Sequence, residues 1–394
     1  MAQVRFFLAD HAGAIHAYEE ALAFRRFIHD VRGQGVTCGK MAEVFEQAGQ
    51  HAKAVESLEC ALRYFVRVNA TGEIGTALNN MAVSYRELGA VDEARRCYER
   101  SLEIRRHAGD FGGLAATLHN LAVLHADRSD YDRARLLLEE ARELRREMGD
   151  NQGLGRTVLR MGMLHEAQGD NSSAIECYEH ALKLAEAEAG VQSRADEATA
   201  LLNLADAWSN QGEIELSLAL IDKAEKLFDD TEMMAGIAMT HYGRARTLAA
   251  AGRPTQALAC FEIARSHFAE LGDRPRLINT GLAIGNILSR RRQHEAARDA
   301  FVSVLQLQRQ LSLPRDEVIT LQLISRECAA AGDAPAARNA AQASADLHRE
   351  VVAHSESHRP ARRYIVDAAA GDGSAPDADE ADEARYPTGP CSLH

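Results

Sequence analysis

The side chains best suited to chemistry in this sequence are amides and guanidinium groups, which suit binding better than catalysis. The amides recur at Asn79, Asn80, Asn120 and Asn203. An asparagine both donates and accepts hydrogen bonds, so it can pair with a peptide backbone of any sequence. Arg156 and Arg160 lie one helical turn apart and together could hold a carboxylate or phosphate. The alternative is that the asparagines bond neighbouring helices and the arginines are solvated.

No motif for catalysis or for a cofactor accompanies these residues. The sequence has no Gly-rich phosphate loop, no H-E-x-x-H and no C-x-x-C. His354 and His358 have metal-ligand spacing, but no acidic third ligand is fixed beside them. We therefore expect a protein that is not an enzyme and that holds neither a metal nor a cofactor.

The elements that carry these residues repeat along the chain with a fixed period. A small residue recurs every 40 residues, with a single interval of 43, at Ala14, Ala54, Ala94, Ala134, Ala174, Ser217, Ala257, Ala297 and Ala337. A bulky apolar residue follows four positions later in most copies, as in Tyr98 and Tyr178. Small and large residues on one helix face allow a second helix to approach closely and be gripped.

Each copy predicts two helices joined by a turn. Gly89 stands where the first helix of one copy should end, because glycine adopts the left-handed conformation at no steric cost. Asp92 and Glu93 then fall in the first turn of the next helix, where negative charge suits the helix dipole. His125 and His165 occupy a position that is aromatic in other copies, so we expect both in the core rather than at a catalytic site.

The order of bulky residue, Ala or Gly, aromatic, turn Gly, Ala and aromatic resembles the tetratricopeptide repeat over roughly residues 1–350. That repeat has about 34 residues, so these copies resemble the longer variety of kinesin light chains and of C-terminal arrays in bacterial regulators. The resemblance implies an all-α, right-handed α-solenoid of about nine repeats, the first incomplete. It also implies an interaction module whose first helices line a concave groove, with Asn79, Asn80, Asn120, Arg160 and Asn203 at ligand-contacting positions.

Chaperone-adaptor members of this family hold a C-terminal carboxylate with five residues from three consecutive repeats. The corresponding positions here are Asn79, Val83, Asn120, Arg156 and Arg160. Asn120 and the two arginines match the pattern in type. Asn79 stands in place of a lysine and Val83 in place of an asparagine, so the carboxylate grip is altered.

Several boundaries follow from the pattern. We expect a repeat array over residues 1–354 and a disordered acidic tail over 355–394. A first inter-repeat loop is expected over 27–34, which contains Gly33, and a further turn near Gly13. The 43-residue interval is attributed to three extra loop residues within 186–193.

The N-terminal segment is apolar where a terminal repeat normally has a polar outer face. Val4, Phe6, Phe7 and Leu8 carry this character. We expect a partner, or an effector domain preceding the array, to cover them.

Composition limits the partners. A net charge of −13 disfavours nucleic acid. Residues 1–24 contain charges and no apolar core segment, and no run near 18 apolar residues exists, so we expect a cytoplasmic protein with no membrane contact. Cys97, Cys177 and Cys260 share one repeat position and are expected to be small core residues.

Together these features predict a non-catalytic scaffold that binds an extended peptide or protein segment in its groove. One alternative is the sensor arm of a bacterial signalling ATPase or transcriptional regulator. Another is a peptide-pheromone receptor, for which a small peptide should co-purify with the protein.

Overall fold

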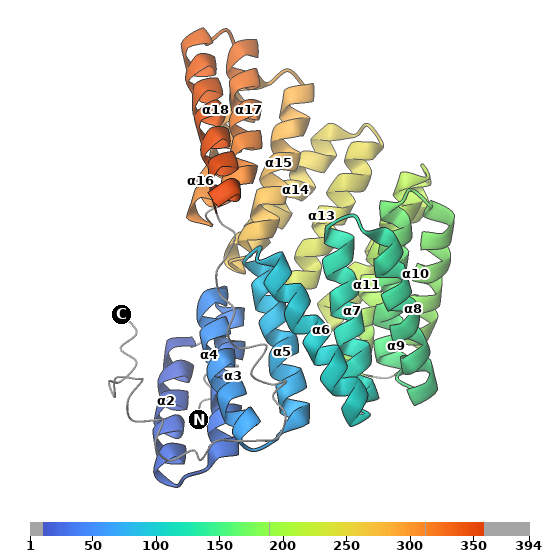
Figure 1. Ribbon diagram of the computed structural model, residues 1–394. Coiled ribbons are helices and arrows are strands. Elements are labelled where there is room, and N and C mark those ends of the chain that lie inside the picture. Colours follow the sequence, from blue (N-terminus) through green and yellow to red (C-terminus); the bar gives the residue numbers. More distant parts are fainter. Residues whose placement is uncertain (1–10, 189, 312, 358–394) are drawn as a thin grey trace. The chain divides into compact units, whose positions relative to one another are not determined.

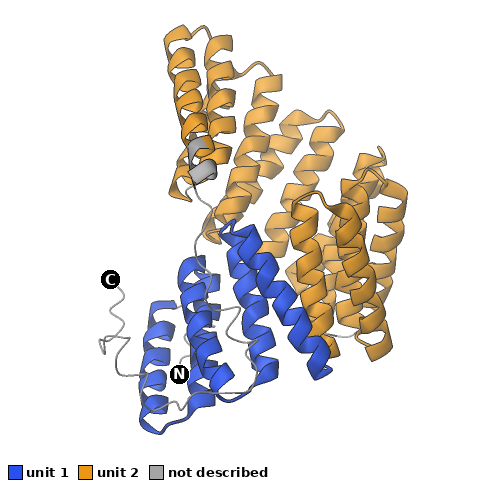
Figure 2. Ribbon diagram, viewed as in Figure 1, with its two compact units in different colours: residues 1–109, 361–394 blue, residues 110–360 orange. Residues whose placement is uncertain are grey.

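A computed structural model describes residues 11–188, 190–311 and 313–357 and contains only helices within them (Figure 1). Val4, Phe6, Phe7 and Leu8, the tail from 358 onward and the side chains of His354 and His358 lie outside the described residues. The chain divides into two compact units, of which unit 1 contains the described residues up to Gly109 and unit 2 those from Asp110 (Figure 2).

Unit 1 contains two helical hairpins preceded by one helix. Its helices are α2 His11–Phe27, α3 Val31–Gln47, α4 His51–Arg67, α5 Thr71–Glu87 and α6 Val91–Ala108. Helix α3 packs on α4 and α5 on α6 as hairpins, while α2 packs on α3 and α4 on α5.

Unit 2 continues the same pattern over six hairpins. Its helices are α7 Phe111–Asp127, α8 Tyr131–Met148, α9 Asn151–Ala167, α10 Asn171–Glu186, α11 Val191–Asn210, α12 Ile214–Asp230, α13 Met234–Ala250, α14 Pro254–Glu270, α15 Arg274–Arg290, α16 His294–Gln310, α17 Pro314–Ala330 and α18 Ala334–Ser357. Each helix packs on its chain neighbours within the unit, and the first helices α7, α9, α11 and α13 also contact one another in sequence. The predicted all-α, right-handed α-solenoid of helix-turn-helix repeats is confirmed.

The repeated small residue is buried in the first turn of the second helix of each hairpin. Ala94, Ala134, Ala174 and Ala257 are all 0% exposed, and the bulky residue four positions after each of them is at most 2% exposed. Tyr178 shows how tight the fit is, because a methyl group added at Gly162 would lie 2.5 Å from its ring. The repeated small and bulky positions were therefore identified correctly as core positions in these hairpins.

The turns follow the predicted chemistry with local corrections. Gly89 has a φ of 73° and follows α5, as expected. Gly13 is not in a turn but in the first part of α2, and the loop predicted over 27–34 is shorter because α3 already begins at Val31. Gly33 lies inside α3, where its amide donates to the side chain of the N-cap residue Asp30 at 2.9 Å.

The three extra residues of the long repeat do not lie in the loop where the sequence placed them. Helix α10 ends at Glu186, and α11 begins at Val191 and runs for 20 residues, against 17 for α9 and α13. The insertion therefore lengthens the N-terminal end of α11.

The buried small residues give a direct test of the packing. Replacing Ala257 by leucine places three extra carbon atoms where no space exists, so we expect the free energy of unfolding to fall by about 1–3 kcal/mol. Urea unfolding followed by circular dichroism measures this change.

Ala259→Leu is the matched control, since Ala259 is exposed two residues further along α14. We expect its effect to stay within about 0.5 kcal/mol of zero. Equal losses for the two variants would show that the repeat position is not a close helix contact.

Candidate functional site

Two pockets open on the side of unit 2 formed by α9, α11 and α13. The first has a volume of about 340 Å³ and lies among α9, α10 and α11. The second has a volume of about 310 Å³ and lies among α11, α12 and α13. Thr199 lines both, so the pockets lie on either side of α11.

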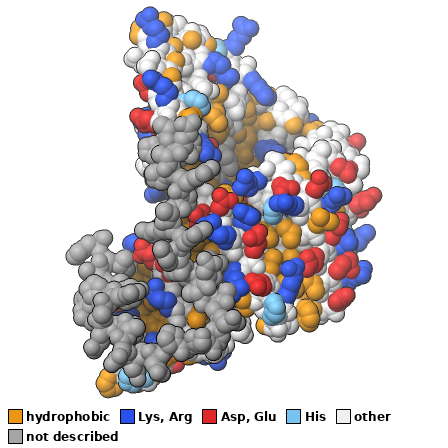
Figure 3. Space-filling model, in the orientation of Figure 1, with side chains coloured by type: hydrophobic (Ala, Val, Ile, Leu, Met, Phe, Trp, Pro, Cys, Tyr) orange, Lys and Arg blue, Asp and Glu red, His pale blue; other side chains and the backbone are white. Residues whose placement is uncertain are grey.

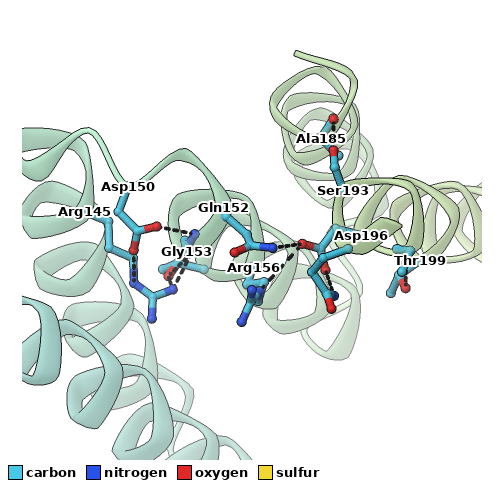
Figure 4. A network of polar contacts seen from close by, with 12 residues as sticks. Arg145, Asp150, Gln152, Gly153, Arg156, Ala185, Ser193, Asp196 and Thr199 are labelled. Carbon is cyan, nitrogen blue, oxygen red and sulfur yellow. Dashed lines mark hydrogen bonds and ion pairs between the residues drawn. The ribbon is translucent and has the colours of Figure 1, made fainter. Parts of the chain in front are cut away.

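The first pocket combines an apolar wall with a carboxylate that gathers polar groups. Leu159 and Leu184 contribute to the wall. Asp196 accepts a hydrogen bond from Gln152 Nε2 at 3.3 Å, and the Nε of Arg156 lies 3.8 Å from the same oxygen (Figure 4). Asp196 therefore neutralises Arg156 at the pocket rim without engaging it in a short bidentate contact.

The lengthened start of α11 builds part of this pocket. Gly190, Val191, Gln192 and Ser193 all line it. Ser193 is buried and donates to the backbone oxygen of Glu188 at 3.2 Å and to that of Ala185 at 2.5 Å (Figure 4). The insertion is therefore fixed against the end of α10.

The second pocket is more aromatic. Tyr242 lines it and packs edge-on against Phe261, with ring centroids 5.5 Å apart. At the rim, Arg246 donates to Asp206 at 2.9 Å, which joins α13 to α11. An apolar floor with a paired charge beside it suits a side chain that has both an apolar body and a polar end.

A buried arginine fixes the start of α9 next to the first pocket. Arg145 is 8% exposed, donates to Thr157 Oγ1 at 2.7 Å and also bonds the backbone oxygen of Gly153 (Figure 4). Asp150 caps α9 by accepting from the Gly153 amide at 2.8 Å. Burial is the main cause that lowers the pKa of Arg145 from its usual value.

Two of the residues predicted from the sequence line the pockets. Arg156 is exposed and lines the first pocket, and Asn203 lines the second. The Nδ2 of Asn203 donates to the backbone oxygen of Thr199 at 2.8 Å, within α11. Asn120 on α7 and Arg160 on α9 are half-buried and line neither pocket.

The other predicted residues belong to unit 1. Asn79 and Asn80 lie half-buried on α5, and Asn79 Nδ2 donates to Asn80 Oδ1 at 3.2 Å. Val83 is half-buried on the same helix. The structure thus brings Arg156 and Asn203 to pockets that flank one helix, and it places the two neighbouring asparagines of α5 in a separate unit.

Sequence reasoning missed the acidic members of the site. Asp196 occupies the position held by Gly153 and Gly236 in the flanking repeats, so the repeat pattern gave no reason to select it. Asp206 and Arg246 were also missed, although their 40-residue separation places them at one position of successive first helices. Opposite charges one repeat apart could have indicated this ion pair.

The histidines expected in the core are half-buried and paired with capping residues. His125 Nδ1 lies 3.0 Å from Asp130, and His165 Nδ1 lies 3.5 Å from Asp170. Of the three cysteines expected to be core residues, Cys97 is buried and Cys177 and Cys260 are half-buried. In the part of the chain that the structure describes, no three His, Cys, Asp or Glu side chains are placed to hold a metal ion.

His119 on α7 has an unusual electrostatic environment. Burial lowers its pKa to about 3, and the positive charges of Arg145, Arg160 and Arg156 contribute to the same effect. Its Nδ1 is buried without a hydrogen-bond partner among the described residues. His119 is therefore neutral at pH 7 and offers an acceptor beside three arginines.

Charges of both signs are interspersed on the face of α7 to α11 drawn in Figure 3. No helix in the described ranges is both long and apolar enough to cross a membrane.

Both units are helical repeat structures. Each is built of stacked hairpins in which a buried small residue is followed four positions later by a large one. Family models described as tetratricopeptide repeat match residues 73–147, 159–230 and 236–310, more than half of the chain. The chain therefore belongs to the tetratricopeptide repeat family. No curated protein sequence matches it.

Several solved structures share the fold at low sequence identity. The apo form of the quorum sensor NprR from B. thuringiensis is 10% identical with a TM-score of 0.55, covering 88% of this chain and 96% of that one. A Rap protein complexed with Competence and Sporulation Factor is 12% identical with a TM-score of 0.56, covering 79% and 96%. Aspartyl phosphate phosphatase F from Bacillus subtilis is 15% identical with a TM-score of 0.57, covering 73% and 74%.

The depressed pKa of His119 predicts acid sensitivity. Between pH 6.5 and about pH 3 the unfolded chain binds a proton at this histidine that the folded chain does not, so stability is lost as the pH falls through this window. At about pH 5 the loss should reach about 2 kcal/mol. Urea unfolding at about pH 7 and pH 5 should show His119→Gln losing less stability than the unmodified protein.

His180→Gln serves as the control, because His180 is exposed on α10. This variant should lose as much free energy of unfolding between about pH 7 and pH 5 as the unmodified protein does. The assignment fails if His119→Gln is as acid-sensitive as the unmodified protein.

Proposed function

We propose that unit 2 binds an extended peptide segment along α9, α11 and α13, with successive ligand side chains in the two pockets. The pair of pockets on either side of α11 is the observation that carries this proposal. Each volume, about 340 and 310 Å³, is at the small end for ligand sites, which suits single side chains of a longer ligand.

Arg156 is the proposed anchor for a ligand carboxylate. Its guanidinium is about half exposed and lies 3.8 Å from Asp196, a weak pairing of a kind that contributes about 0–1 kcal/mol. A carboxylate that approached the exposed side could form a bidentate contact, which is stronger. Replacing the Asp196 contact of Arg156 by a contact with the ligand carboxylate therefore costs little free energy.

The amides are proposed to bind the ligand backbone. Asn203 uses its Nδ2 within α11, and its Oδ1 can accept from a peptide N–H at the second pocket. Asn120 and Arg160 extend the proposed contacts toward α7. Asn79 and Asn80 are proposed to make equivalent backbone contacts within unit 1.

The similar solved structures support a peptide as the ligand. One of them, the Rap protein, is complexed with Competence and Sporulation Factor, and another, NprR, is described as a quorum sensor. This favours, as a second candidate, a receptor for a small signalling peptide that reports to an effector. In either case the protein acts by binding, with no reaction of its own and no nucleic acid as ligand.

Selection from a library of random linear peptides displayed on phage, with the full chain as bait, provides probes for this proposal. Enriched peptides labelled with a fluorophore then give dissociation constants by anisotropy. Reversing two charges in the Arg156→Glu and Arg160→Glu double variant should weaken binding at least about ten-fold, which corresponds to about 1.4 kcal/mol. The single variant Arg156→Ala, at an exposed position, should weaken it in the same direction.

Arg133→Glu with Arg135→Glu is the matched control, because it makes the same change of charge at two exposed positions of α8. Its affinity should equal that of the unmodified protein. Binding along α9, α11 and α13 is excluded if the Arg156 variants bind as tightly as the control. It is also excluded if bound peptide slows hydrogen exchange only in the second helices of these hairpins, α10, α12 and α14.

A further inference from the structure

Two cysteines of unit 1 face each other across the hairpin of α3 and α4. Cys38 Sγ lies 3.3 Å from Cys60 Sγ, in a donor-acceptor contact. Both cysteines are unlinked in the structure, with Cys38 buried at 2% exposure and Cys60 half-buried. The contact is close enough for chemistry between the two sulfurs and leaves one of them accessible.

The repeat itself shows that Cys60 is unusual. Cys38 stands where Leu78, Leu118 and Val158 lie in later copies, which is a core position. The position of Cys60 is mostly charged or polar in the other copies, as in Glu20, Arg100, Glu140, His180, Lys223 and Ser303. Core packing therefore explains Cys38, and it does not explain a thiol at 60.

Positive charge surrounds the half-buried thiol. Arg63 is one turn further along α4 and hydrogen-bonds Cys60, and Arg26 at the end of α2 adds a second charge. The hydrogen bond from Cys38 is the largest cause that lowers the pKa of Cys60, to about 6, with the two arginines acting in the same direction against burial. The thiolate form is therefore favoured at Cys60, and the buried Cys38, whose pKa is raised by its hydrogen bond to Cys60, favours the protonated form.

We infer that Cys38 and Cys60 are an oxidisable dithiol, in which Cys60 reacts with a peroxide and Cys38 then closes a disulfide between α3 and α4. Among the residues that the structure describes, the other cysteines offer no such arrangement, since Cys97 and Cys328 are buried, and burial raises the pKa of Cys177 and of Cys260. The inference concerns unit 1 and is independent of peptide binding in unit 2.

The chemistry balances with hydrogen peroxide as the oxidant. The Cys60 thiolate attacks one peroxide oxygen, the O–O bond breaks, and hydroxide leaves to form water with a proton while Cys60 becomes a sulfenic acid. Cys38 gives up its proton and attacks the Cys60 sulfur, the S–O bond breaks, and a second water leaves. Two thiols and one peroxide thus yield one disulfide and two waters, with both electrons passing from sulfur to oxygen.

The geometry requires only a small movement. A disulfide bond is about 2.0 Å long, so the sulfurs must approach by about 1.3 Å from their separation of 3.3 Å. The bond would link the two helices of one hairpin, which already pack against each other.

The test treats the reduced full chain with one equivalent of hydrogen peroxide, blocks remaining thiols with iodoacetamide and maps the digest by mass spectrometry. We expect a peptide linked through Cys38 and Cys60 as the main product. Without peroxide, iodoacetamide should modify Cys60 at least about five-fold faster than Cys177 or Cys260 at pH 7, with a midpoint of the rate near pH 6.

Two variants separate the roles of the cysteines. Cys38→Ala should stop the reaction at the Cys60 sulfenic acid, which dimedone traps, and should move the midpoint of Cys60 alkylation to higher pH. Cys60→Ser should abolish the linked peptide, and Cys97→Ser is the control that should leave it unchanged. The alkylation rates of the unmodified protein need no variant and decide the question if a variant fails to fold.

Three results would overturn the inference. The first is a rate of Cys60 alkylation no greater than that of Cys177 and Cys260. The second is a main disulfide between two chains, or one that joins Cys60 to Cys391, which lies outside the described residues. The third is unchanged Cys60 alkylation in Cys38→Ala, because the buried thiol would then not act on its neighbour.

Discussion

The close approach of two helices at a small residue is the interaction on which the rest of the structure depends. Ala134 and Ala174 are 0% exposed, and the large side chains Leu138 and Tyr178 fill the space beside them at 1% and 0%. Because a helix can approach this closely only where side chains are short, the position of the alanine fixes how the two helices of a hairpin lie. These contacts therefore also determine where the pocket-lining residues of α9 and α11 lie.

Polar contacts fix how successive hairpins are aligned along their helix axes, which apolar packing alone would define less well. Within unit 2, Ser289 donates to Glu327 at 2.8 Å and Asn210 donates to Glu166 at 2.8 Å, each joining helices of different hairpins. Burial is the largest effect on both carboxylates. The hydrogen bonds from His294 and Ser289 leave the pKa of Glu327 lowered, whereas Glu166 keeps a raised pKa despite two such bonds. Glutamate therefore joins hairpins in both places, with its charged form favoured at position 327 and disfavoured at position 166.

The sequence predicts what repeats and fails where a copy departs from the others. Ala174, Tyr178 and Gly89 were placed correctly because the same physical demand recurs in each hairpin. The three extra residues before α11 were assigned to a loop, since a single copy cannot show whether an insertion extends a helix. Their position is decided by contacts such as that of Ser193 with the end of α10, which join residues that no periodicity relates.

The departures from the repeat bear on the candidate site, because packing positions must be alike in every copy while binding positions need not be. The lengthened start of α11, together with its N-cap residue, supplies four lining residues of the first pocket, and Asp196 gathers its polar groups at a position that is glycine in both flanking repeats. Cys60 likewise departs from a charged or polar position and faces a second thiol. In a chain built from copies, a residue that differs from its equivalents and makes a specific contact is a stronger sign of function than its chemical type alone.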